Sequence, residues 1–131
     1  MNNIISILAA CLALVAVAHA DIVVIGNVTA ATMTKDEVSD LFLGKTQARK
    51  PLDQSSSAPI KAQFYQTVTG HDLAQIRALW SRLIFTGRGL PPKELPDAAA
   101  VKKAVAADLK AVGYIRKSEV DSSVKVILLL N

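Results

Sequence analysis

All charged side chains of the chain, 15 Lys or Arg and 11 Asp or Glu, lie after residue 20. Because the preceding segment is uncharged and mostly apolar, a soluble fold has to be built from residues 21–131. A body of this length can bury one hydrophobic core and is too short for two domains. Its apolar content is ordinary for a globular protein, which excludes a disordered, collagen-like or coiled-coil chain.

Residues 1–20 are predicted to be a signal peptide. The apolar run from Ile4 to Val17 suits the hydrophobic region of such a peptide and is shorter than the roughly 20 residues of a membrane span. It is followed by Ala18-His19-Ala20, a small-x-small cleavage pattern, so cleavage at about Ala20 would release a periplasmic or secreted domain over 21–131. The basic start typical of signal peptides is missing, which leaves a retained N-terminal anchor helix as an alternative.

A second alternative is a lipid anchor. Leu8-Ala9-Ala10-Cys11 resembles the lipobox of bacterial lipoproteins, in which Cys11 would carry the lipid. It ranks below cleavage at Ala20 because only about five apolar residues precede Cys11. Cys11 is the only cysteine of the chain, so cleavage after Ala20 would leave no disulfide, thiolate metal ligand or cysteine nucleophile.

Strands and helices are expected to alternate along residues 21–131. β-Branched and apolar runs predict strands over 21–27, 112–115 and 124–130, with a further short strand over 50–53. This alternation is typical of an α/β fold. We therefore expect a single three-layer domain in which helices flank a mixed sheet.

Four helices are expected between these strands. Thr34 and Glu37 form a capping box at the start of the first, and Asp72 and Asp97 can cap the third and fourth. Gly44 and Gly70 would end the first two helices. The apolar residues expected to face the core are Val38, Leu41 and Phe42; Ile60, Phe64 and Val68; Leu73, Ile76, Leu79, Trp80, Leu83 and Ile84; and Val101, Ala104, Val105 and Leu109.

A polar loop before the second helix is the best candidate for a ligand site. Gln54, Ser55, Ser56 and Ser57 would present hydroxyls and backbone N–H groups at a helix start, where the partial positive charge favours phosphate or sulfate. Lys61, one turn inside the helix, adds a formal charge. The alternative is plain capping, in which Ser57 satisfies the helix end and the other serines face solvent.

A second basic group comprises Arg77, Arg82, Arg88 and Lys93. Arg88 lies between glycines in the loop over 86–92, where backbone and guanidinium could meet an anion together, so it joins the candidate ligand-binding residues. The other three are expected on solvated surfaces. Basic residues are dispersed and lack interleaved aromatic residues, which argues against a nucleic-acid partner.

Enzyme chemistry has little support in the sequence. After cleavage His71 would be the only histidine, and no nucleophile or orienting group stands in a pattern that would make it a base. No paired-carboxylate, histidine-rich or EF-hand spacing indicates a metal site, and there is no phosphate-binding loop for nucleotides. We therefore expect a protein that is not an enzyme, with neither metal nor cofactor.

Three segments together resemble a known family. These are Thr34-Lys-Asp-Glu-Val-Ser-Asp-Leu-Phe-Leu-Gly-Lys45, Trp80-Ser-Arg-Leu-Ile-Phe-Thr-Gly-Arg-Gly-Leu-Pro-Pro92, and Val112-Gly-Tyr-Ile115 followed by the final strand. In this order and spacing they resemble the short phosphate ABC transporter substrate-binding-like proteins of the periplasmic binding protein type II superfamily. The resemblance covers about Asp21 to Leu130. It implies the fold of one lobe of such a protein, in which Ile22–Asn27 and Val124–Leu130 are similar to the strands that cross the hinge.

The resemblance also implies a function. It points to an exported, non-catalytic solute-binding-like module, with phosphate or a similar oxyanion as ligand and an ABC transporter as partner. The family's phosphate loop carries an Arg and a Ser-Gly-Thr run, whereas here Gln54 stands at the Arg position and Ala58-Pro59-Ile60 at the others. The alternative is an interaction or structural protein that keeps the one-lobe fold without ligand binding and acts as a homodimer or a partner-binding subunit.

Overall fold

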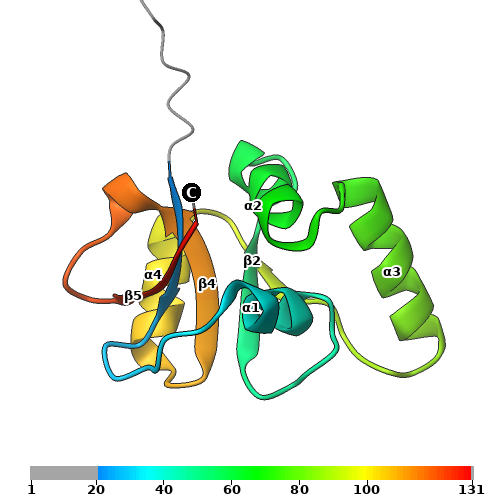
Figure 1. The fold of residues 1–131 in the computed structure, drawn as a ribbon, viewed down its shortest axis with the longest axis horizontal. Helices are drawn as coiled ribbons and strands as arrows, with labels where there is room; N and C mark the ends of the chain where they lie inside the picture. Colours follow the sequence, from blue (N-terminus) through cyan, green and yellow to red (C-terminus); the bar gives the residue numbers. More distant parts are fainter. Residues whose placement is uncertain (1–20, 131) are drawn as a thin grey trace, which may run out of the picture.

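The computed structural model describes residues 21–130 (Figure 1). The predictions of a signal peptide, a cleavage site at Ala20 and a lipid anchor at Cys11 lie outside these residues. Within them, no helix has the length and apolarity needed to cross a membrane. The elements, in chain order, are β1 (Ile22–Gly26), α1 (Lys35–Phe42), β2 (Lys50–Gln54), α2 (Pro59–Thr69), α3 (Leu73–Phe85), β3 (Lys93–Leu95), α4 (Ala98–Ala107), β4 (Ala111–Arg116), a 3₁₀ turn (Lys117–Glu119) and β5 (Lys125–Leu130).

The five strands form one mixed sheet in the order β3-β2-β4-β1-β5. β2 pairs in parallel with both β3 and β4, whereas β1 pairs antiparallel with β4 and β5. The parallel half therefore places the carboxyl ends of β2 and β3 side by side. Helix-containing connections link these parallel strands, as the geometry of parallel pairing requires.

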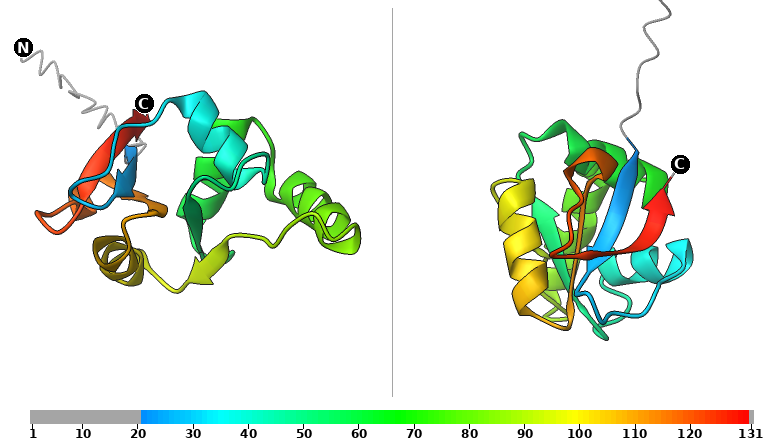
Figure 2. Two further views of the ribbon diagram at one scale, coloured as in Figure 1. Left: turned by 90° about the horizontal axis from the view of Figure 1, so that it is seen from below. Right: turned by 90° about the vertical axis from the view of Figure 1, so that its left-hand side faces the viewer.

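Helices cover both faces of the sheet, which confirms the expected three-layer α/β domain (Figure 2). Strand β1 shows the reason, because its side chains alternate between two cores. Ile22 and Val24 face the core shared with α1 and α2, whereas Val23 and Ile25 face the core under α4. All four are buried, so an apolar run without polar alternation is what a central strand requires.

The helix starts follow the predicted caps. The capping boxes of Thr34 with Glu37 and of Asp72 with Gln75 are both formed, and the Asp97 carboxylate accepts from Ala100 N at 2.9 Å. α1 and α2 end before Gly44 and Gly70, which both take positive φ angles. At Gly44 an added Cβ would also lie 2.8 Å from Trp80, so this glycine lets α3 approach the end of α1.

α4 packs directly on β4 at Gly113. A Cβ at this position would lie 2.4 Å from Val101 Cγ1, closer than packed carbon atoms approach. Val101 and Val105 are fully buried here, as predicted, and Ala104 is half-buried. Leu109, however, lies beyond the end of α4 and is 67% exposed, so its assignment to the core was wrong. The helix stops before another turn can bring that side chain to the sheet.

Three further predictions are corrected by the structure. Ile84 is 50% exposed, because α3 buries only Ile76 and Trp80 fully and its last turn extends past the core. Gln54 is the last residue of β2, not part of the loop. The short strand β3 was not predicted, since Lys93-Glu94-Leu95 is too short and too polar to show strand alternation.

Candidate functional site

A buried carboxylate stands at the carboxyl end of β2. Asp53 is 3% exposed and accepts hydrogen bonds from two tyrosine hydroxyls, that of Tyr65 on α2 at 2.6 Å and that of Tyr114 on β4. The Gln54 backbone N–H donates to the same carboxylate at 3.1 Å. Three donors from three elements therefore satisfy the carboxylate and fix α2 to the sheet.

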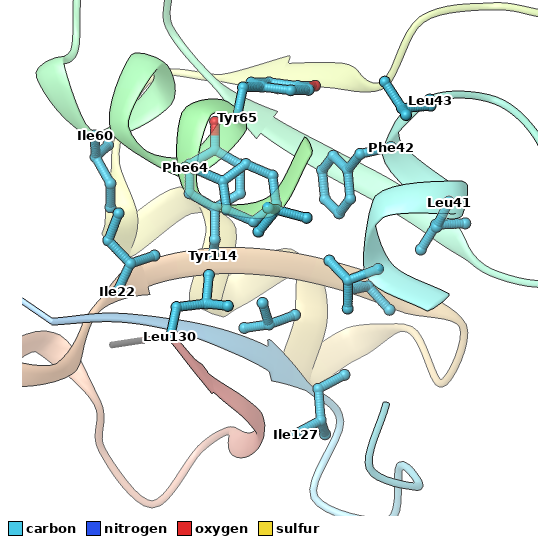
Figure 3. Packing of buried hydrophobic residues seen from close by; sticks show 14 of the residues in the cluster. Ile22, Leu41, Phe42, Leu43, Ile60, Phe64, Tyr65, Tyr114, Ile127 and Leu130 are labelled. Carbon is cyan, nitrogen blue, oxygen red and sulfur yellow. The ribbon is translucent and has the colours of Figure 1, made fainter. Parts of the chain in front are cut away.

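Aromatic packing holds these hydroxyls in place (Figure 3). The rings of Phe64 and Tyr114 are stacked with centroids 3.9 Å apart, and Phe42 of α1 meets Phe64 edge-on at 4.8 Å. Phe42, Phe64, Tyr65 and Tyr114 are all fully buried. The tyrosine hydroxyls thus reach Asp53 from a rigid apolar layer, as buried tyrosines with a polar tip commonly do.

Burial dominates the electrostatics of this cluster. Desolvation raises the pKa of Asp53 above its ordinary value of 3.8, against the hydrogen bonds from Tyr114 and Tyr65 and the charge of Lys61, which lower it. Burial together with the adjacent Asp53 charge also raises the pKa of both tyrosines. The two hydroxyls therefore stay protonated and act as donors.

Lys61 lies between two carboxylates. Its Nζ is 3.7 Å from Asp53 Oδ2 and 2.9 Å from Glu94 Oε1, and its side chain is largely buried. Asp53 and Glu94 are register partners across the parallel strands β2 and β3, so both side chains start from the same face of the sheet. A cation between them offsets the repulsion of two neighbouring acidic groups.

The serine loop joins this cluster from the side of α2. Ser56 Oγ donates to Glu94 Oε1 at 3.1 Å and accepts from Lys61 Nζ at 3.2 Å. Ser55 and Ser57 share a hydroxyl–hydroxyl hydrogen bond of 2.9 Å. The Lys61 and Ser56 hydrogen bonds hold the pKa of Glu94 below its ordinary value. The structure therefore gathers Ser56 and Lys61 around one carboxylate oxygen.

The capping interpretation of Ser57 was wrong. The N-cap of α2 is Ala58, which makes no side-chain cap, and Pro59 follows as the first helical residue. Ser57 is bonded to Ser55 instead. The start of α2 therefore lacks the hydroxyl cap that most helices use.

Two predicted site residues lie apart from the serines. The Gln54 side chain is buried, and its Nε2 donates to the Tyr114 carbonyl at 2.8 Å. Arg88 follows the end of α3, where its backbone N–H donates to the Leu83 carbonyl at 2.9 Å. Within residues 21–130 no hydrogen bond or ion pair joins the Arg88 side chain to the serine loop. Their assignment as ligand-binding residues stays a prediction.

Sequence reasoning missed four residues of this cluster, namely Asp53, Tyr65, Tyr114 and Glu94. One signal for Asp53 was available, because an acidic residue directly after an apolar strand residue and before a polar loop often marks the end of a strand. Glu94 had no such signal, since its position next to Asp53 depends on the unpredicted strand β3.

A surface pocket of about 560 Å³ lies elsewhere, on the α4 side of the sheet. Three basic residues, Arg49, Lys50 and Lys93, line it, and Lys50 is paired with Asp108 at 3.1 Å. It shares no residue with the serine cluster. No group of three or more His, Cys, Asp or Glu side chains placed to hold a metal ion occurs within 21–130.

The raised pKa of Asp53 predicts a pH effect that Asp53→Asn removes. An acid with a raised pKa in the fold contributes its full stability below its unfolded pKa, near 3.9, and loses it as pH rises through the folded-state pKa. Unfolding free energies of both proteins should be measured in urea from pH 3.5 to 8. We expect the original chain to lose stability relative to Asp53→Asn as pH rises. A constant difference at all pH values would contradict the raised pKa, whatever the offset between the proteins.

Comparisons with known proteins bear on the fold. Neither protein-family models nor curated protein sequences give a match. Solved structures do: a phosphate ABC-type transport receptor from Vibrio cholerae aligns with 82% of the chain at 17% identity and a TM-score of 0.62. A Clostridium perfringens protein of the phosphate ABC transporter substrate-binding class, solved with bound phosphate, gives 82%, 18% and 0.66, and PstS from Borrelia burgdorferi gives 85%, 10% and 0.58.

The alignment covers only part of each of these structures, namely 45%, 44% and 47% of their chains. The chain thus spans less than half the length of the structures it matches. At these identities the likeness establishes the fold. Residues 21–130 fold like about one half of a phosphate ABC transporter substrate-binding protein, which confirms at the level of the fold the resemblance seen in the sequence.

Proposed function

We propose that the chain is an exported, non-catalytic module that binds phosphate or a similar oxyanion at the start of α2. The observation that carries this proposal is the convergence of Ser56 Oγ and Lys61 Nζ on one oxygen of Glu94. A carboxylate held by a hydroxyl and an ammonium group is a stand-in for an oxyanion, because both present the same kind of acceptor. The donors are therefore already placed to receive an anion.

The proposal requires that the ligand displace Glu94. The Glu94 side chain is half exposed and comes from a three-residue strand, so it can turn away without opening the core. Lys61 would stay, because Asp53 holds it from below at 3.7 Å. Ser55, Ser57 and the backbone after Asp53 would supply further donors at a helix start that has no side-chain cap.

The fold supports the same function at a coarser level. The matched solved structures include a phosphate transport receptor and a protein with bound phosphate. We infer that this chain likewise serves an ABC transporter after export, with a site to which a second surface contributes. Because the chain spans less than half of those structures, we expect its own affinity for phosphate to be weak.

The test is calorimetric titration of phosphate and sulfate into the original chain and into Glu94→Gln. Removing the competing carboxylate charge is expected to tighten phosphate binding by about five- to tenfold, the equivalent of roughly 1–1.4 kcal/mol. Glu37→Gln is the matched control, because glutamine also serves in a capping box and Glu37 lies on α1. No heat with either anion at tens of millimolar in any of these proteins would remove the ligand from the proposal.

A second candidate is an interaction protein that keeps the fold without a ligand. It is favoured by the position of β5 at one edge of the sheet, where Val126 and Leu129 are partly exposed. An apolar edge strand can pair with a second copy or with another subunit. Sedimentation in the same buffers separates the candidates, because a dimer that gives no anion-dependent heat fits the second and a monomer that binds phosphate fits the first.

A further inference from the structure

The net charge of the chain is concentrated in one segment. Residues 73–93, which hold α3 and the loop after it, contain Arg77, Arg82, Arg88 and Lys93 and no acidic residue. The whole chain has 15 basic and 11 acidic residues, so taking these four away leaves 11 of each sign. The formal charge of +4 therefore belongs to this segment, while the rest of the chain is balanced.

The outward face of α3 is unusual for a helix exposed to water. Ala74, Ala78, Ser81 and Phe85 follow one another at spacings of four, three and four, and so share one face. All four are exposed, and none is charged. At 100° per residue Arg77 and Arg82 flank this face on opposite sides. An exposed helix face normally carries charged side chains, whereas here they stand only at its borders.

Large apolar side chains gather where this helix ends. Phe85 is 92% exposed and Leu90 is 83% exposed, and Ile84 lies beside them at the last turn. The chain then folds back onto the helix, because Gly87 N donates to Ile84 O and Arg88 N donates to Leu83 O. Arg88 is thereby held next to the exposed apolar end.

α3 stands at one end of the molecule in two views (Figures 1 and 2). Its inner side is fixed by Ile76 and Trp80. The outer side is convex, and three exposed apolar side chains bury far less than the roughly 800 Å² per partner of a stable protein interface. A second copy would also bring two positively charged faces together. A lipid surface requires neither a matching contour nor a large buried area.

We propose that the outer face of α3 and the loop after it form a docking surface for an anionic lipid bilayer. Phe85 and Leu90 enter the headgroup region, and Arg77, Arg82 and Arg88 contact the phosphates of anionic lipids. Basic side chains near an anionic membrane and apolar side chains at its interface act together in peripheral binding. This surface is independent of the serine loop, so it does not rest on the proposed oxyanion site.

The local test is Phe85→Trp in the full chain, with Leu109→Trp as the matched control at another exposed apolar position. Fluorescence is measured with vesicles of phosphatidylcholine alone and with 30% phosphatidylglycerol. We expect the emission of the new tryptophan at 85 to shift to the blue, and to be quenched by brominated lipids, only with the anionic vesicles. Vesicle binding without this shift, or with the shift at position 109 instead, would overturn the proposal.

The contributions of charge and apolar contact are separated by vesicle sedimentation. Arg77→Gln, Arg82→Gln and Arg88→Gln together should weaken binding by on the order of a hundredfold, and Phe85→Ser with Leu90→Ser by at least about tenfold. The controls are Lys35→Gln, Lys103→Gln and Lys117→Gln together, and Val28→Ser with Leu109→Ser. All proteins share residues 1–20, so differences between them come from the substituted surfaces.

Three results would contradict the proposal. Equal losses for the test and control sets would mean that overall charge, not this face, governs binding. Equal binding to neutral and anionic vesicles, unaffected by 0.5 M NaCl, would exclude the charge complementarity on which the proposal rests. Concentration-dependent self-association that Phe85→Ser abolishes would assign the face to a second copy of the chain instead.

Discussion

Truncation of Phe64 to alanine is expected to lower the free energy of unfolding by about 3–5 kcal/mol. Phe64 is fully buried, stacks on Tyr114 at 3.9 Å and meets Phe42 edge-on at 4.8 Å. Its removal leaves a cavity between α2 and the sheet that rigid neighbours cannot close. Urea denaturation should show a lower midpoint with an unchanged slope, since the same surface is exposed on unfolding.

The control is the same substitution at Phe85. Phe85→Ala removes an exposed side chain and should change the free energy of unfolding by no more than about 0.5 kcal/mol. If Phe64→Ala is unfolded without denaturant, Phe64→Leu provides a smaller cavity and a measurable midpoint. Equal losses for Phe64→Leu and Phe85→Ala would contradict the packing described for this core.

Phe64 also positions the candidate site. It lies on α2 directly before Tyr65, whose hydroxyl reaches Asp53, and one turn after Lys61. The apolar layer thus sets the angle at which α2 presents both donors to the end of β2. Stability of the core and geometry of the oxyanion site are therefore linked through one helix, and a cavity at Phe64 should weaken phosphate binding as well.

The sequence was sufficient for the parts of the fold that depend on local pattern. Thr34 and Glu37 define a helix start within four residues, and the run from Ile22 to Ile25 reads as a buried strand because both of its faces are covered. β3 could not be predicted this way, since its three residues are held by pairing with β2 and not by their own alternation. Strand propensity is weak evidence where neighbours decide.

The same distinction explains the candidate site. Ser56 and Lys61 were predicted, because a serine run and a lysine near a helix start are local features. Asp53 and Glu94 were missed as partners, because their approach depends on parallel pairing between segments some forty residues apart. Burial of Gln54 likewise follows from Tyr114, which comes from a distant strand. The long-range contacts determine which polar groups face inward.

Lys61→Met is expected to cost roughly 3 kcal/mol of unfolding free energy at pH 8. Lys61 is the cation between Asp53 and Glu94, and methionine keeps its apolar volume while removing its charge. Asp53 would then lie buried without a compensating cation, which costs more than the pair itself contributes. The loss should shrink toward pH 4, because Asp53, whose pKa burial has already raised, can take up a proton instead.

A second substitution identifies the cause of this loss. In Lys61→Met with Asp53→Asn no buried charge remains at the end of β2, so we expect the double variant to lose less stability than the sum of the single variants. Lys50→Met is the matched control, because Lys50 forms an exposed pair with Asp108, and it should change stability little. Additive losses, or a loss independent of pH, would show that Lys61 contributes by packing alone. The oxyanion proposal would then lose the charge on which it depends, because only a Lys61 held as a cation by Asp53 can still attract phosphate after Glu94 has turned away.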